Sequence, residues 1–229
     1  MPVSVIENPS PNQGPRRHDA RPDMIVLHYT AMESAKAALE RLCDPEAEVS
    51  AHYLISEVGQ VFALVPEDQR AWHAGAGAWG AVCDVNSRSI GIELANTGTH
   101  PFPNPQMTAL CDLMRGIMQR WSIPIENVIG HSDMAPHRKC DPGRRFDWRR
   151  LADEGLSIWP ETGREPGGFL QDAQVFGYVP SQDADEAAIL AAFRQRFRPW
   201  ADGPLCTTDR ALMADLAARF PVDRHHANA

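Results

Sequence analysis

The segment GHSDMAPHRKCDPG, residues 130–143, carries the side chains with the clearest chemical potential in this chain of 229 residues. It places His131, Lys139 and Asp141 close together, and its two prolines disfavour a regular helix. We therefore expect an irregular loop that is too polar to pack as core. Imidazole nitrogens and carboxylate oxygens are zinc ligands, and a catalytic zinc keeps one position open for water. His131 and Asp141 are candidates for two of the ligands.

Two other segments offer a third ligand or an acid–base residue. MIVLHYTA contains His28 at the end of an apolar run, and SIGIELAN contains Glu93 within one. Side chains alternate along a strand, so His28 shares a face with Val26, whereas Glu93 faces away from its isoleucine neighbours. A carboxylate in an apolar strand is unfavourable unless it is paired or functional. From the residues alone, His28 and Glu93 can each be structural or functional.

The elements that must position these residues follow from the apolar pattern. Buried strands are expected at 24–28, 53–58, 61–65, 89–95 and 127–130. Amphipathic helices are expected after Ser34, from Asn104 and after Asp147. Residues 1–22 and 66–88 have the composition of irregular segments. The alternation predicts an α/β fold with a mixed central sheet flanked by helices.

The composition changes near residue 160, where ETGREPGG indicates a polar linker. Three amphipathic helices are expected after it, over 169–176, over 185–197 and behind a Thr208 cap. We predict a first domain at 1–162 and a linker with a small three-helix module at 163–229. A chain cut after residue 162 is expected to keep its fold, because the boundary is polar.

Charge and cysteine usage limit the partners and the compartment. The net charge is −8 and the pI is about 5.6, which argues against nucleic acid as a partner. The first twenty residues contain no apolar signal segment, and we predict no membrane segment. Five cysteines without paired spacing favour a reducing, cytoplasmic location. A periplasmic location is the alternative if a signal has been removed.

Five segments in order, VLHYTA, SAHYLI, AWHAG, SIGIELAN and GHSDMAPHRKCDPG, resemble the zinc-dependent N-acetylmuramoyl-L-alanine amidases. Peptidoglycan recognition proteins share that fold, and the resemblance runs from about residue 5 to about residue 160. The tail, with GYVP and AILAAFRQRFRPW, is similar to the three-helix peptidoglycan-binding-like module of the branch typified by outer-membrane lipoprotein amidases. The implied partners are peptidoglycan fragments, namely muropeptides and anhydromuropeptides.

The resemblance implies roles for individual residues. The implied ligands of one zinc ion per chain are His28, His131 and Asp141. Glu93 matches the general base, and Lys139 matches the residue that stabilises the oxyanion. The implied substrate-binding residues are His73, Trp79 and Asn96. For His73 a packing role is an equal alternative, and for Trp72 and Trp79 packing against the sheet is the better one. His137 and Cys140 depart from the family pattern, and we expect neither to bind zinc because neighbouring side chains in an extended loop point apart.

The implied reaction is hydrolysis of the amide between the lactyl carbonyl of N-acetylmuramic acid and L-alanine of the stem peptide. Glu93 would take a proton from the attacking water and pass it to the leaving amine. We predict a role in cell-wall recycling on soluble anhydromuropeptides. The alternatives are an exported amidase that acts on polymeric peptidoglycan and a non-catalytic muropeptide-binding protein. The complete set of implied ligands favours an enzyme.

Overall fold

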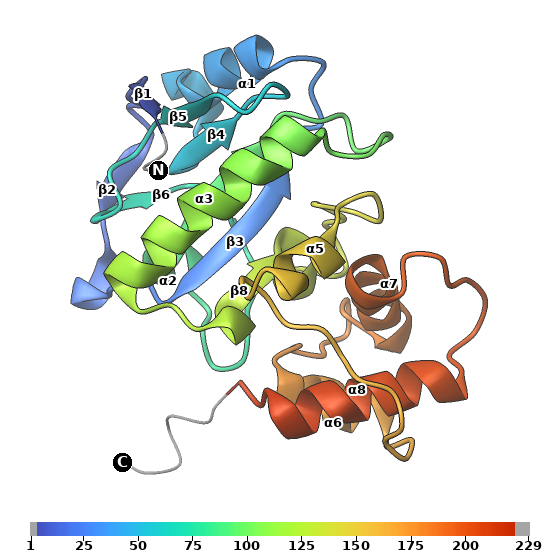
Figure 1. Ribbon diagram of the computed structural model, residues 1–229. Coiled ribbons are helices and arrows are strands. Elements are labelled where there is room, and N and C mark those ends of the chain that lie inside the picture. The colour runs from blue at the N-terminus through green and yellow to red at the C-terminus, as the bar shows by residue number, and fades with distance from the viewer. Residues whose placement is uncertain (1–3, 223–229) are drawn as a thin grey trace.

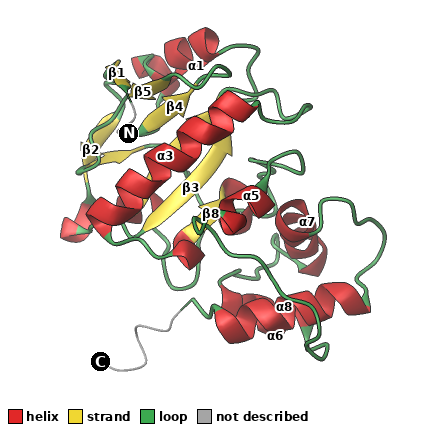
Figure 2. Ribbon diagram, in the orientation of Figure 1, coloured by secondary structure: helices red, strands yellow, loops and turns green. Residues whose placement is uncertain are grey.

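A mixed six-stranded sheet forms the centre of the computed structural model, which describes residues 4–222. The outermost limits of the two predicted domains, residues 1 and 229, lie outside this range. The strand order is β1-β5-β4-β7-β3-β8, and β2 and β6 form a separate pair (Figures 1 and 2). The strands are β1 Val5–Glu7, β2 Gln13–Pro15, β3 Met24–Tyr29, β4 Tyr53–Ile55, β5 Val61–Ala63, β6 Gln69–Ala71, β7 Ser89–Leu94 and β8 Val128–Gly130. The predicted α/β fold is confirmed.

The middle of the sheet is parallel. Strand β3 runs parallel to both β7 and β8, and β4 is parallel to β7. Strands β4 and β5 form the antiparallel hairpin expected around Gly59. Because β3, β7 and β8 run in the same direction, their carboxyl ends lie at one edge, which is where open α/β sheets bind ligands. His28 and Glu93 are register partners at that edge.

The helices confirm the expected start signals in the first part of the chain. They are α1 Ala35–Leu42, α2 Val85–Arg88, α3 Asn104–Trp121, α4 His131–Met134, α5 Trp148–Asp153, α6 Phe169–Phe176, α7 Glu186–Phe197 and α8 Thr207–Arg219. The Ser34 side chain accepts a hydrogen bond from the amide of Ala37 at 3.2 Å, and Asp147 accepts one from Arg150 at 3.0 Å. Both caps satisfy amides that have no partner within their helix.

Three local predictions were wrong. Residues 1–22 and 66–88 are not wholly irregular, since β2 and β6 pair with each other and α2 precedes β7. These elements have three or four residues, too few for a hydrophobic period to be visible. Helix α8 begins after Cys206 rather than behind a Thr208 cap, and the carboxylate of Asp209 accepts the Cys206 amide at 3.0 Å.

The two faces of the sheet are covered by different helices. Helix α3 lies across one face, where Leu110 and Met114 pack against Ile25 and Leu27 (Figure 1). On the other face, residues at the amino-terminal end of β3 belong to one apolar cluster with the tail helices α6, α7 and α8. A fully buried aliphatic side chain contributes about 1.5–3 kcal/mol. The division at residue 162 stays a prediction about the chain, and this cluster spans it.

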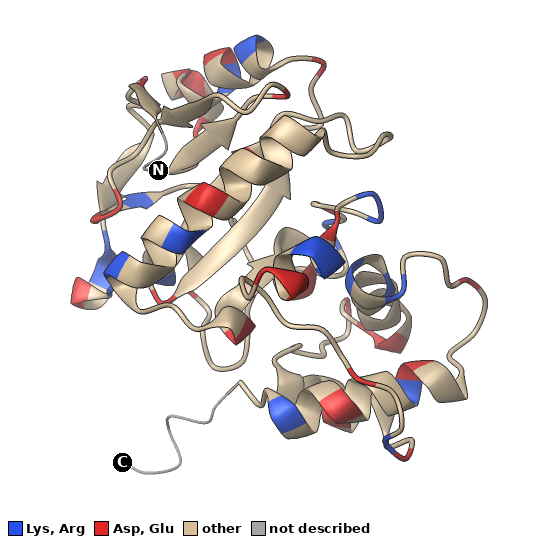
Figure 3. Cartoon of the chain, viewed as in Figure 1, with Lys and Arg blue, Asp and Glu red and all other residues tan. Residues whose placement is uncertain are grey.

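Charged residues are interspersed over the helices in view in Figure 3, with both signs on α3 and α5. Several pair within one helix, such as Arg149 with Asp153 at 2.9 Å. Exposed pairs of this kind contribute little to stability. Within residues 4–222, none of the helices combines the length and the apolar character that crossing a bilayer requires.

Candidate active site

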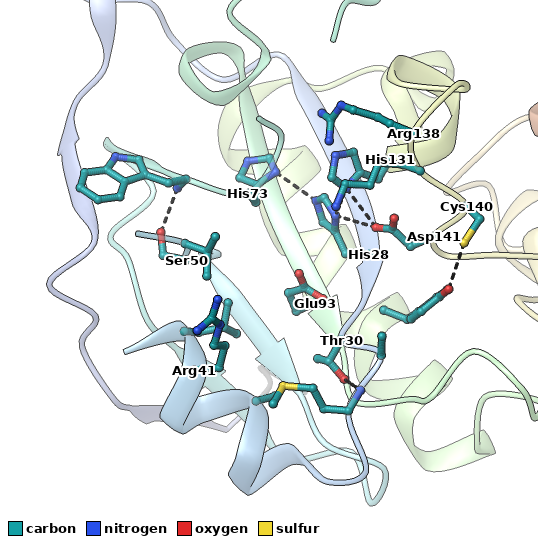
Figure 4. A pocket seen from close by; sticks show the side chains of 18 residues that line it. His28, Thr30, Arg41, Ser50, His73, Glu93, His131, Arg138, Cys140 and Asp141 are labelled. Carbon is teal, nitrogen blue, oxygen red and sulfur yellow. Dashed lines mark hydrogen bonds and ion pairs between the residues drawn. The ribbon is translucent and has the colours of Figure 1, made fainter. Parts of the chain in front are cut away.

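The three predicted metal ligands come together at the carboxyl edge of the parallel strands (Figure 4). His28 ends β3, His131 directly follows β8, and Asp141 closes the loop after α4. The Nδ1 atom of His28 lies 2.9 Å from Nδ1 of His131 and 2.9 Å from Oδ2 of Asp141. The third side of this triangle, from His131 Nδ1 to Asp141 Oδ2, measures 3.1 Å. Three acceptor atoms are thus aimed at one point.

The other ring nitrogens of both histidines are held by neighbours. The Nε2–H group of His131 donates to the carbonyl of Ala74 at 2.8 Å, which leaves Nδ1 with a free lone pair. His28 Nε2 lies 3.0 Å from Nδ1 of His73, whose Nε2 lies 3.2 Å from the hydroxyl of Ser89. Ser89 in turn donates to the carbonyl of Val85 at 2.6 Å. In a chain directed this way His28 also presents an unprotonated Nδ1, as metal-binding histidines do.

Burial and close contacts shift the pKa values of His28 and Asp141. Burial, with a smaller contribution from the neighbouring His131, lowers the pKa of His28 to about 4, so the ring is neutral at neutral pH. Burial alone would raise the pKa of Asp141, but the close contacts of its carboxylate with the rings of His131 and His28 outweigh burial and hold the pKa well below the usual range. Two imidazole nitrogens with free lone pairs and one carboxylate form a ligand set that divalent metals such as zinc accept.

Glu93 faces the same point from β7. Its Oε2 atom is buried and has no hydrogen-bond partner within the described residues 4–222. Burial, with a further contribution from Asp141, raises the pKa of Glu93 to about 8. An unpartnered buried oxygen beside three converging lone-pair atoms fits a site that is completed by a cation and its water. The residues present therefore fit a metal ion.

A cavity of about 330 Å³ opens beside these residues. Its polar lining includes Lys139 and Arg138 from the loop, Arg41 from α1 and Ser50, and Trp72 lines it beside Ser50. Figure 4 shows Arg41 and Arg138 on different sides of the cavity. Arg138 is held by the carbonyls of Ala74 and Ala76, at 2.6 Å and 2.7 Å. These cationic side chains in the cavity lining favour a substrate that carries carboxylates.

The loop is more ordered and more buried than its composition suggests, so the expectation that it cannot pack as core was wrong in part. Residues 131–134 form the short helix α4, and residues 131–135 are buried. The amide of Ser132 donates to the carbonyl of Asp141 at 2.9 Å, which ties the two ends of the loop together. The tail helices cover α4, and a pattern within fourteen residues cannot reveal a cover that comes from elsewhere.

Two expected substrate-binding residues lie away from the cavity lining. Trp79 is 2% exposed and makes edge contacts with Phe176 and Tyr178, so its ring packs against residues of the tail. Asn96 is buried, and its side chain accepts the Gly98 amide at 2.7 Å to form a turn after β7. Both side chains make contacts within the fold, and a role for either in substrate binding stays a prediction.

His73, His137 and Cys140 occupy three different environments. His73 lines the cavity while it contacts His28, so it supports a ligand as well as facing the opening. His137 is exposed, and it is absent from the cavity lining. Cys140 lines the cavity with its sulfur 3.1 Å from the hydroxyl of Tyr29. The converging group among the described residues is His28, His131 and Asp141, without His137 or Cys140.

Three further residues at the site were not predicted from the sequence. Arg41 has the pattern of an ordinary exposed helix position, and no local signal marks it as lining the cavity. Ser89 supports His73 only because β7 begins beside it. Arg138 stands in the loop beside Lys139, and that cluster of basic residues was a usable signal.

Comparison with known proteins agrees with this geometry. Residues 18–144 match the family model described as N-acetylmuramoyl-L-alanine amidase. The chain is 35% identical over 209 residues to the N-acetylmuramoyl-L-alanine amidase AmiD of Escherichia coli (strain K12), covering 77% of this chain and 75% of AmiD. It is also 35% identical over 166 residues to the 1,6-anhydro-N-acetylmuramyl-L-alanine amidase AmpD of Enterobacter cloacae, covering 65% of this chain and 89% of AmpD.

Two solved structures share the fold at similar identity. AmiD from E. coli, in complex with anhydro-N-acetylmuramic acid-L-Ala-D-gamma-Glu-L-Lys, has a TM-score of 0.80 at 33% identity and covers 87% of this chain and 90% of its own. AmpDH3 from Pseudomonas aeruginosa, in complex with anhydromuramic pentapeptide, has a TM-score of 0.79 at 31% identity and covers 90% and 94%. With the family match and the converging histidines and aspartate, this chain belongs to the N-acetylmuramoyl-L-alanine amidase family.

Proposed function

We propose that this chain is a zinc-dependent hydrolase that cuts the amide bond between N-acetylmuramic acid, or its anhydro form, and L-alanine of peptidoglycan stem peptides. The observation that carries the proposal is the buried triangle of His28, His131 and Asp141 beside the unpartnered oxygen of Glu93. Zinc suits this donor set, with one ion per chain. The proposal accounts for four buried polar groups that would otherwise be unfavourable at a sheet edge.

Each residue has a distinct task in the proposed reaction. A zinc ion here would polarise the carbonyl and bring the pKa of a bound water to about 7. Glu93 takes a proton from the attacking water and returns it to the leaving amine. The nearby cation favours the ionised form of Glu93, which burial alone would keep protonated at neutral pH. Lys139, on the cavity wall, offsets the negative charge of the tetrahedral intermediate. His73 orients His28, and it also faces the bound substrate.

We further propose soluble anhydromuropeptides as the substrates and cell-wall recycling in the cytoplasm as the role. The cavity offers Arg41, Arg138 and Lys139 to the carboxylates of a stem peptide. AmiD and AmpDH3 were crystallised with anhydromuramic peptides, which supports the same substrate class. The five cysteines are free in the described structure, as suits a reducing compartment.

An exported enzyme that acts on polymeric peptidoglycan is the second candidate. It is supported by the likeness to AmiD, whose structure covers 87% of this chain, more than residues 1–162 alone could supply. The tail is thus shared with that protein. A binding protein without activity is the third candidate, and the presence of all three converging ligands argues against it.

Mass spectrometry of products from a defined anhydromuropeptide and from purified sacculi, in parallel, tests the proposal. We expect zinc-dependent release of intact stem peptide, faster from the soluble fragment. Faster release from sacculi would favour the second candidate, and fractionation of cells that make the native protein would decide its compartment. Binding of the fragment without any product would overturn the enzymatic proposal.

A further inference from the structure

A buried ion pair joins the tail to the short helix that begins with His131. Arg196 of α7 approaches Asp133 of α4, with 2.8 Å between Nη1 and Oδ2, and both side chains are at most 2% exposed. The hydroxyl of Tyr178, also from the tail, donates to Oδ1 of Asp133 at 2.7 Å. The amide of Gly130 donates to Oδ2 at 2.8 Å. Two of the three donors to this carboxylate therefore come from beyond residue 162.

Arg196 also holds the strand that leads to the metal site. Its Nη2 atom donates to the carbonyl of Val128, the first residue of β8, at 2.8 Å, and to the hydroxyl of Ser157 at 3.3 Å. The guanidinium lies over the ring of Trp148, 4.4 Å from its centre. One side chain of the tail thus contacts both the start of β8 and the helix that follows it.

Helix α4 needs this support. It has four residues, and a helix of that length is not stable by itself. Its inner side belongs to the apolar cluster shared with the tail, in which Met134 lies with Phe176 and Phe197. With Arg196 replaced by an apolar side chain, Asp133 would stay buried and keep the Gly130 amide but lose its cationic partner. A buried carboxylate in that state is strongly unfavourable, so α4 would shift or open.

His131 is the first residue of α4, and the Ser132 amide binds the carbonyl of the ligand Asp141. Movement of α4 would displace both side chains from the triangle with His28. We propose that the tail helices are part of the scaffold of the metal site, with Arg196 and Tyr178 acting through Asp133 as positioning residues. Metal affinity then depends on contacts made by the tail. This inference rests on the proposed metal site.

The test is the zinc dissociation constant of full-length variants, measured by competition with a chelator, with thermal unfolding recorded alongside. We expect Arg196→Met and Tyr178→Phe to raise the dissociation constant about 10- to 100-fold, as loss of support for a metal ligand does. Saturating zinc should restore most of the turnover of Tyr178→Phe, which removes one oxygen and leaves the ring in place.

Arg194→Met is the matched control. Arg194 is on the same helix and is similarly buried, but its partner Asp209 belongs to the tail, at 2.6 Å. This variant should be less stable and should bind zinc like the wild type. If Arg196→Met proves unfolded, Tyr178→Phe alone carries the test.

Folded Tyr178→Phe and Arg196→Met with wild-type zinc affinity would overturn the inference, as would an equal loss of affinity in Arg194→Met. A wild-type chain that binds no zinc would instead overturn the proposed function, and the inference with it. The two failures are therefore distinguishable by the zinc content of the wild-type protein.

Discussion

Two regions of this molecule bury charged side chains, and they satisfy them in opposite ways. In the tail, Asp209 accepts bonds from Arg194, Arg198 and the Cys206 amide, and Arg194 also binds two backbone carbonyls. At the sheet edge, His28, His131 and Asp141 turn acceptor atoms toward one another, and an oxygen of Glu93 has no partner among residues 4–222. Burial is similar in both places. What distinguishes a binding site is the charge and hydrogen bonding that the protein leaves incomplete.

The largest expected effect is the loss of a converging ligand. His131→Ala should abolish zinc binding and turnover, because two donors cannot hold a catalytic zinc. His137→Ala, in the same loop but absent from the cavity lining, is the control and should keep both. Metal analysis and peptide release measure the two properties. Full zinc occupancy in His131→Ala would remove it from the ligand set.

A smaller effect is expected at the unpartnered carboxylate. Glu93→Gln should keep zinc and fold while turnover falls by about 10²–10⁴, the usual contribution of a positioned general base. Glu67→Gln is its counterpart, since Glu67 is bound by Tyr53 and Trp121. That variant should change stability and leave turnover near normal. Loss of metal from Glu93→Gln would make Glu93 a ligand or a structural residue.

Lys139 tests the charge on the cavity wall. Lys139→Met should lower kcat by roughly 10²-fold with little change in zinc content, because removing one donor to a developing oxyanion raises the barrier by about 3 kcal/mol. Arg145, exposed two residues beyond that segment and absent from the cavity lining, provides a control as Arg145→Met. Steady-state kinetics on a defined muropeptide separates kcat from KM. An unchanged kcat would leave Lys139 a solvated loop residue.

A substitution in the buried pair of Asp209 and Arg194 should lower the stability of the protein and leave its turnover unchanged. Asp209→Asn should lower the free energy of unfolding by about 3 kcal/mol, because Arg194 loses its buried counter-charge. Burial acts to raise the pKa of Asp209, but bonds from Arg194 and the Cys206 amide outweigh it and lower the pKa. The stabilisation is therefore present above the unfolded pKa of about 3.9 and is lost as pH falls below it. Denaturant unfolding at neutral and acid pH should show the gap between variant and wild type closing on acidification.

The features best predicted from the sequence are those that depend on the local spacing of apolar and capping residues. Alternation along β3 and β7 placed His28 and Glu93 on strands whose register pairs them, and the capping residues marked the starts of α1 and α5. What failed depends on distant residues. Asp133 is indistinguishable from a solvated loop aspartate until Arg196, far along the chain, is placed against it. For Trp79 the sequence favoured packing, but the partner in that packing, Phe176 of the tail, could not be named from the pattern around Trp79.

The hydrogen bond from Ser132 to Asp141 has a consequence for how the chain tolerates metal loss. It closes the ligand loop with backbone alone, so the entropy of bringing the two ends together is spent when the protein folds. In small zinc domains the ion itself organises the chain, and chelators denature them. In this chain the ion would bind a site whose ligand loop is already closed by the fold. A chelator should therefore remove the metal without unfolding the chain, and the apo protein should bind the metal again when it is added back.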